Sequence, residues 1–74
     1  MARTKTIYIE LLDEGTPCWR PVDAEELGGE LYRITGQRPD DEIWAFVQGD
    51  IVKCRIQNFQ ESGSQLVAFE KTSQ

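Results

Sequence analysis

Histidine is absent from this chain of 74 residues, and cysteine, proline and methionine are scarce, with two, three and one residues. Histidine is the side chain that most often acts as a general acid or base near neutral pH, so we expect no enzymatic activity. Cys18 and Cys54 lie far apart in the sequence, and no histidine is available to complete a zinc site with them. We therefore predict no catalytic residue, no metal site and no cofactor.

Long apolar runs are missing as well. No stretch approaches the roughly 20 apolar residues of a membrane span, or the core of a signal peptide. The chain is therefore expected to be soluble and cytoplasmic, without membrane contact. In a reducing compartment Cys18 and Cys54 are expected to be free, buried thiols; a disulfide would require the fold to place them opposite each other.

The length and composition indicate one small globular domain. Hydrophobic residues make up 39% and charged residues 28% of the chain, which is the range of ordinary folded proteins. We expect a single domain over residues 1–74, with residues 1–5 and 72–74 frayed at its ends.

Alternation of apolar and polar residues predicts short strands along most of the chain. The first is TIYIELL, residues 6–12, followed by a turn. In CWRPV, residues 18–22, Pro21 removes one ladder donor, so this segment is expected to be an edge strand or a bulged one.

Two interpretations remain open for the segment that follows Val22. The aspartate and glutamate of DAEEL, three residues apart, have the spacing of a helix N-terminal box, which would give one helical turn. Alternatively, the strand continues to residue 27 and turns at Gly28 and Gly29 into ELYRITG, because glycine supplies the positive φ of a tight hairpin. We favour the hairpin.

The stretch DDEIWAFVQGDIVKCR, residues 40–55, contains two apolar runs around a glycine and an aspartate. Trp44 and Phe46 share one face of the first run, which is apolar on both faces and therefore predicted to be a central strand. A turn at residues 48–50 then leads to a second strand, so that the two form a hairpin. In this second strand Val52, Cys54 and Ile56 are expected to point inward.

A further turn over ESGS, residues 61–64, leads to LVAFEK, where the inward pair is either Val67 with Phe69 or Leu66 with Ala68. Five or six short strands in so small a chain bury their apolar faces only by curling. We therefore predict a mainly all-β fold, either a small antiparallel barrel or two orthogonal sheets.

The stretch from residue 40 resembles the diverging turn of Src-homology-3 domains: an acidic lead-in, Trp44 and Phe46, then Gly49 and Asp50 before an aliphatic strand. The resemblance implies a Src-homology-3-like barrel. The aromatic motif with which that family reads proline-rich peptides is missing, so this activity is not implied. The wider pattern of LLDEGTPCWRPV, LGGELYRI and EIWAFVQGDIVKC is similar to a group of small uncharacterised bacterial proteins.

The charge of −5 is unevenly distributed along the sequence. Residues 10–42 contain ten acidic side chains and three arginines, a balance of −7, and the remainder has a balance of +2. Such a field repels phosphate backbones and attracts basic proteins. Trp19 and Arg20 are of the residue types that usually anchor interfaces.

We therefore expect a non-enzymatic module that binds a basic protein partner, as immunity proteins and inhibitors do, and that is a monomer or a homodimer. If Trp19 belongs to the core instead, then Tyr8, Tyr32 and Phe59 are the next candidates for an exposed aromatic anchor. The alternative is a nucleic-acid-binding barrel that works through the basic residues Arg3, Lys5, Lys53, Arg55 and Lys71. The candidate partner-binding residues are Trp19, Arg20, Asp13, Glu14, Glu25, Glu26, Glu30, Asp40, Asp41 and Glu42.

Overall fold

The computed structural model describes residues 3–12, 15–60 and 63–72, and within these it contains strands and turns but no helix. The strands are β1 (Arg3–Leu12), β2 (Cys18–Gly28), β3 (Leu31–Ile34), β4 (Ile43–Trp44), β5 (Ile51–Phe59) and β6 (Gly63–Lys71). The predicted all-β fold is therefore confirmed. A helix long and apolar enough to cross a bilayer is not found in the described ranges.

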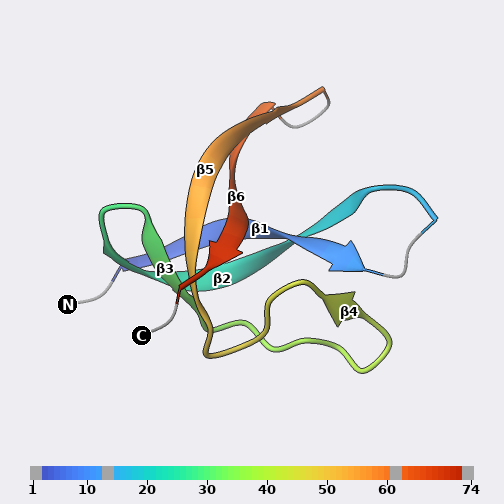
Figure 1. The fold of residues 1–74 in the computed structure, drawn as a ribbon, viewed down its shortest axis with the longest axis horizontal. Coiled ribbons are helices and arrows are strands. Elements are labelled where there is room, and N and C mark those ends of the chain that lie inside the picture. Colours follow the sequence, from blue (N-terminus) through green and yellow to red (C-terminus); the bar gives the residue numbers. More distant parts are fainter. Residues whose placement is uncertain (1–2, 13–14, 61–62, 73–74) are drawn as a thin grey trace.

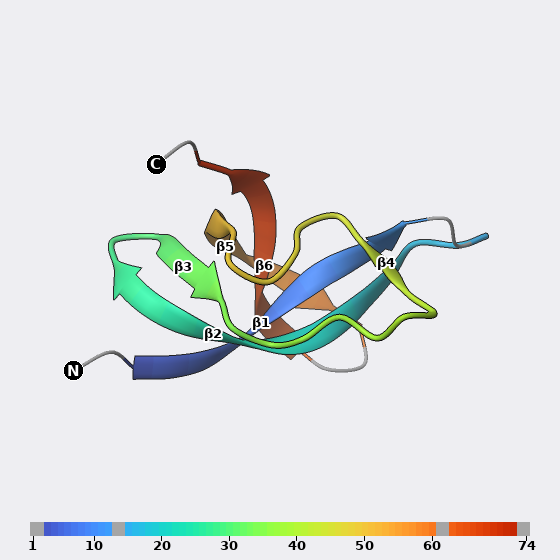
Figure 2. The same cartoon turned by 90° about the horizontal axis from the view of Figure 1, so that it is seen from below.

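Five strands close into a ring: β1 pairs with β2, β2 with β3, β3 with β5, β5 with β6 and β6 with β1, while β4 is added to β1. The β6–β1 contact is parallel and consists of the pair Tyr8 and Val67; the other pairings are antiparallel. Figures 1 and 2 show the long β1–β2 pair crossing the long β5–β6 pair. The sheet thus curls into the small barrel that the sequence predicts.

The core forms where the strand alternation points inward. Ile7 and Ile9 of β1 are fully buried, whereas Tyr8 and Glu10 lie on the outer face. Trp44 is 4% exposed, and Phe46 packs against the same cluster, as predicted. The other core side chains are Val22, Ala24, Tyr32, Ile34, Val52, Cys54 and Ala68.

The predicted hairpin between β2 and β3 is confirmed. Residues 23–27 continue β2 rather than forming a helical turn, and Gly28 and Gly29 adopt φ values of 108° and 61°. These conformations favour glycine, because a Cβ is strained there. Up to Val22, β2 is bonded to β1 but not yet to β3, whose pairing begins at Ala24; the strand containing Pro21 is therefore an edge at that point.

The predicted hairpin between the two runs of residues 43–56 is wrong. β4 pairs with β1, through Leu11 with Trp44 and Leu12 with Ile43, while both edges of β5 are occupied by β3 and β6. Ile43 is 52% exposed, so this run is also not a central strand. The turn that separates the two runs is bonded elsewhere: the Gly49 N–H donates to the Ile34 carbonyl at 2.8 Å, which directs β5 towards β3.

The expectation that Ile56 points inward is also wrong, because its side chain is 63% exposed. β3 covers β5 only from Ile51 to Lys53, and beyond that point β5 continues as a two-stranded ribbon with β6. Val52 and Cys54 lie inside the ring and are buried as predicted. Ile56 lies past the end of the β3–β5 pairing, where within the described residues β5 is paired with β6 alone.

Of the two predicted inward pairs in β6, Leu66 with Ala68 is confirmed, because Ala68 belongs to the core cluster and Leu66 packs against it. A β-bulge follows directly after this pair. Lys53 faces Glu70 and Cys54 faces Ala68, so Phe69 is the extra residue of the bulge. Val67 and Ala68 are therefore both buried although they are neighbours, while Phe69 is 39% exposed.

Part of the two segments expected to be frayed lies within the described residues, and residues 1–2 and 73–74 lie outside them. Strand β1 already begins at Arg3, which pairs with Glu26, and the Thr72 N–H donates to the Ile51 carbonyl at 2.9 Å. Both cysteines are free thiols, but only Cys54 is buried; Cys18 is half-buried, because it begins β2 outside the core.

Candidate protein-binding surface

The first surface of interest lies between β1 and β6. The two strands meet at Tyr8 and Val67 and run in different directions (Figure 1), and Ala45 and Phe46 of the loop after β4 contribute to the surface beside them. The result is a groove of about 270 Å³ whose lining includes Glu10, Trp19, Phe46, Arg55, Val67 and Phe69. It combines an apolar floor with one acidic and one basic side chain.

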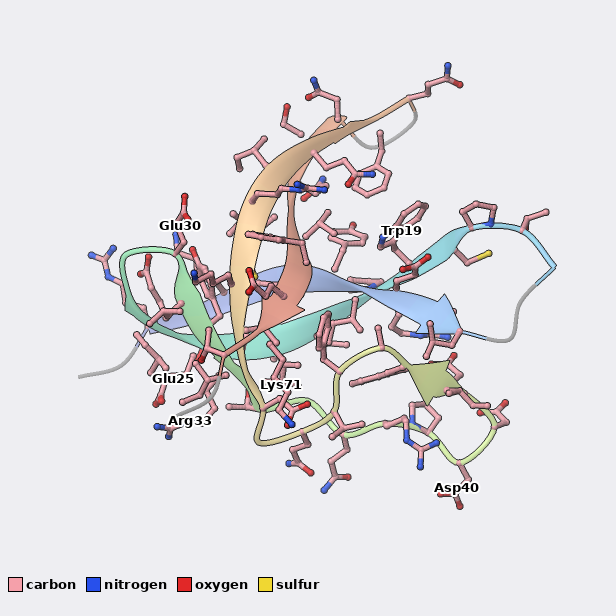
Figure 3. The ribbon with its side chains drawn as sticks, viewed as in Figure 1. Trp19, Glu25, Glu30, Arg33, Asp40 and Lys71 are labelled. Carbon is pink, nitrogen blue, oxygen red and sulfur yellow. The ribbon has the colours of Figure 1, made fainter. Side chains whose placement is uncertain are left out.

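Trp19 lies on the outer face of β2, directly opposite Glu10 in β1. It is half-buried and does not belong to the core cluster. Its ring contacts the Phe59 ring edge-to-face, with the centroids 5.3 Å apart, and the centroid of the Tyr8 ring lies 5.6 Å from that of Phe59. Figure 3 shows Trp19 projecting from β2 beside the β5–β6 pair. The next candidates Tyr8 and Phe59 thus join Trp19, whereas Tyr32 is buried in the core.

Arg55 and Phe69 form the opposite wall of the groove. The guanidinium carbon of Arg55 lies 4.9 Å from the centre of the Phe69 ring, a cation–π contact. The bulge in β6 places Phe69 there, since a regular register would have paired it within the ladder. The Arg55 guanidinium makes no ion pair and no hydrogen bond within the described chain, so its donors remain available.

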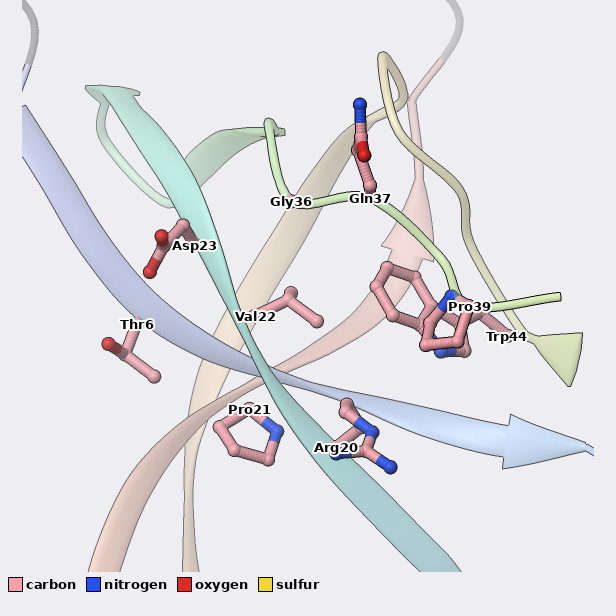
Figure 4. Close-up of a pocket in the computed structure, with 9 residues that line it drawn as sticks. All are labelled: Thr6, Arg20, Pro21, Val22, Asp23, Gly36, Gln37, Pro39 and Trp44. Atoms are coloured by element: carbon pink, nitrogen blue, oxygen red, sulfur yellow. The ribbon is translucent and has the colours of Figure 1, made fainter. Parts of the chain in front are cut away.

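A second cavity, of about 330 Å³, lies on another side of the molecule, between β2 and the loop after β3 (Figure 4). Its lining includes Arg20, Pro21, Asp23, Gln37 and Trp44. The loop is fastened to β2 there, because the Asp23 carbonyl accepts hydrogen bonds of 3.1 Å from the N–H groups of residues 35 and 36.

Glu42 ties this second region together. Its Oε1 accepts hydrogen bonds of 2.9 Å from Arg20 Nε and from Trp44 Nε1, and Arg20 Nη2 donates to its Oε2. Arg38 bonds to the Glu42 carbonyl as well. The hydrogen bond from Arg20, and then that from Trp44, hold the pKa of Glu42 below its ordinary value of 4.5. The side chains of Arg20 and Glu42 are thus both engaged within the protein.

The structure separates the predicted anchors. Trp19 and Arg20 are neighbours in β2, so their side chains point to opposite faces of the strand: Trp19 lies at the groove and Arg20 is bound to Glu42. Arg20 therefore does not join Trp19 in one surface.

The predicted acidic residues also do not gather in one place. Figure 3 shows Glu25 and Glu30 at the β2–β3 end and Asp40 at the opposite end of the molecule. Glu25 forms an ion pair of 3.2 Å with Arg33. Glu26 lies beside Glu25 in β2, and Asp41 lies beside Asp40 in the loop before β4. Asp13 and Glu14 lie outside the described residues.

Sequence reasoning missed Glu10, Phe46, Val67 and Phe69 as members of one surface. They come from three separate segments, and the register of β1 with β6 brings them together. Phe69 lies in the apolar run LVAFEK, in which either of two alternating sets could face inward. A bulge changes which residues face inward within such a run, so this ambiguity was the sequence signal for Phe69.

The buried thiol and the acidic side chains do not favour nucleophilic or metal chemistry. Burial raises the pKa of the Cys54 thiol to about 12, which makes it a poor nucleophile at neutral pH. Within residues 3–12, 15–60 and 63–72 no three histidine, cysteine or acidic side chains are arranged to hold a metal ion.

No protein-family model, curated protein or solved structure matches this chain. The resemblance to Src-homology-3-like proteins therefore stays a prediction.

Proposed function

We propose that this protein is a non-enzymatic binding module that holds a basic protein partner in the groove between β1 and β6. The observation that carries the proposal is the exposed aromatic surface formed by Trp19 and Phe69 beside Arg55. Aromatic and arginine side chains, tryptophan above all, contribute most to binding when a partner covers them.

The overall charge favours a basic partner. A net charge of −5 on so small a molecule produces a field that raises the rate of encounter with positively charged proteins. The acidic side chains are spread over both ends of the molecule, so they attract the partner at long range without forming a contact surface. The groove supplies the direct contacts. An inhibitor or immunity protein directed against a nucleic-acid-handling protein would have this combination, since such targets expose basic grooves.

Affinity capture from an extract of the source cell tests this proposal. The baits are the wild type, W19A and I56A; Ile56 is a matched control, because it is a large exposed apolar residue that does not line the groove. We expect a basic protein that is retained by the wild type and I56A, is lost with W19A, and elutes as salt is raised. Capture of neutral partners alone, or equal capture by W19A, would contradict the proposal.

Nucleic-acid binding is the second candidate, and the stacked pair of Arg55 and Phe69 favours it, because bases stack on aromatic and guanidinium surfaces. It ranks second because Lys71 is paired with Asp50 at 3.4 Å and Lys53 lies opposite Glu70 in the ladder. Titration with single-stranded and duplex oligonucleotides at low salt separates the two functions. Clear affinity that falls with salt would reverse this ranking.

A further inference from the structure

The two charged side chains of the groove are not neutralised by the described chain. Glu10 is exposed and makes no ion pair there, and Arg55 is stacked on Phe69 without an acidic partner. Likewise, the indole N–H of Trp19 donates no hydrogen bond within the described residues, whereas that of Trp44 does. The groove therefore presents a carboxylate, a guanidinium and an indole donor around an apolar floor.

The size of the groove limits what it can hold. Its volume of about 270 Å³ lies just below the roughly 300–1,000 Å³ of small-molecule pockets. It suits one large side chain of a protein partner and the backbone on either side of it. Val67, which pairs with Tyr8 where β1 and β6 meet, is one of its lining residues.

Charge decides between the possible occupants. A second copy of the chain carries the same −5 and is repelled at long range, so the groove favours a segment of a different, basic protein. Within the groove, Glu10 complements a positive side chain, and the free donors of Arg55 complement a carbonyl or a carboxylate.

We propose that the groove binds an extended segment of the partner, which inserts one aliphatic or aromatic side chain between Trp19 and Phe69 and places a lysine or arginine against Glu10. Arg55 donates to a backbone carbonyl or a carboxylate of the same segment. This inference rests on the proposed function and specifies the chemistry that its groove recognises.

Selection from a display library of random 12-residue peptides against the immobilised full chain tests the inference. We expect enrichment of peptides in which an apolar residue lies beside a lysine or arginine. Synthetic copies of the enriched peptides should bind at least about tenfold more weakly to F69A than to the wild type, because truncating a central aromatic anchor has an effect of that size. I56A should bind like the wild type.

A matched charge reversal separates local recognition from general attraction. E10R and E30R change the net charge equally, but Glu10 lines the groove and Glu30 lies in the turn between β2 and β3. We expect E10R to weaken binding several-fold more than E30R, and selection against E10R to enrich acidic residues in place of basic ones. Circular dichroism and denaturant unfolding verify that each variant is folded.

The possible outcomes distinguish the two proposals. Peptides that depend on Phe69 but lack a basic residue would overturn this inference and leave the protein-binding groove intact. Failure to enrich any peptide that depends on Phe69 would overturn it as well, and the capture experiment with W19A would then decide the proposed function independently. A dimer in sedimentation that F69A dissociates would identify the occupant as a second copy, again contradicting the inference.

Discussion

Trp44 in β4 and Trp19 in β2 are the two tryptophans of the chain, and the structure surrounds them differently. The Trp44 ring lies in the core, and its indole N–H donates to a carboxylate that is itself held by Arg20. The Trp19 ring lies on the outside of the barrel and contacts the Phe59 ring edge-to-face, and its indole N–H donates no hydrogen bond within the described residues.

This difference shows how one chain uses the same side chain for stability and for recognition. The Trp44 indole N–H and the Arg20 guanidinium both donate to the Glu42 carboxylate, so these groups are already engaged within the protein. Within the described residues, the Glu10 carboxylate, the Arg55 guanidinium and the Trp19 indole N–H make no hydrogen bond or ion pair, so a partner that covers them gains contacts without breaking internal ones there. Trp44 is therefore expected to determine stability, and Trp19 to determine binding.

The largest expected effect is that of W44A. Removing a core tryptophan leaves a cavity and costs about 3–5 kcal/mol of unfolding free energy. Denaturant unfolding measures it, and W44F, which keeps a ring but loses the hydrogen bond to Glu42, should lie between W44A and the wild type. An unchanged unfolding midpoint in W44A would remove the distinction between the two tryptophans.

Thiol labelling extends the comparison to the neighbouring cysteines. Cys54 is buried with a pKa of about 12, so its thiolate is roughly a thousandfold rarer than that of an ordinary cysteine, and it should react only when the protein opens. Cys18, which precedes Trp19 and is half-buried, should react in the native state. Two equally fast phases with a thiol reagent would show that the core around Trp44 is not closed.

Lowering the pH should weaken the hydrogen-bonded network that holds Trp44 through Glu42. Because the folded-state pKa of Glu42 is lowered from 4.5, its contribution to stability is full above about that pH and is lost as the pH falls through the folded-state value. Denaturant midpoints of the wild type and E42Q should differ at pH 7 and converge as the pH falls below 4.5. E30Q is the control and should keep the wild-type profile. A constant difference at every pH would show that the charge of Glu42 is not what matters.

The smallest expected effect on stability is that of W19A. Its loss removes an exposed aromatic contact with Phe59, which is worth about 1 kcal/mol. Unfolding should therefore change little, while the captured basic partner no longer binds. If W19A unfolds as easily as W44A, then Trp19 is a structural residue and the groove loses its anchor.

Much of the barrel was predictable, because the alternation of apolar and polar residues along a strand indicates which side chains are buried. Ile7, Ile9, Val52 and Cys54 occur at the spacing that a half-buried strand requires, and the structure buries them. The glycines 28 and 29 likewise identified the β2–β3 turn from their conformational freedom.

The pairing of the strands was harder to predict from the sequence, because alternation within a strand does not say which strand lies beside it. The runs around Gly49 looked like a hairpin, but the first run pairs with β1 and the second with β3 and β6. The groove depends on the same long-range information. Phe69 reaches it through a bulge that only the β5–β6 register reveals, and Trp19, unlike Trp44, could not be ranked as surface or core from its neighbours in sequence.

Tryptophan fluorescence during binding tests the central claim most directly. Titrating the captured partner into the wild type should shift the emission to shorter wavelength, because the partner shields Trp19 from water while Trp44 is already buried. In W19F, where Trp44 is the only tryptophan left in the protein, the same titration should produce no shift after the partner's own emission is subtracted. A shift that persists unchanged in W19F would contradict the account, since it would show that the partner is sensed at Trp44 and not at the groove.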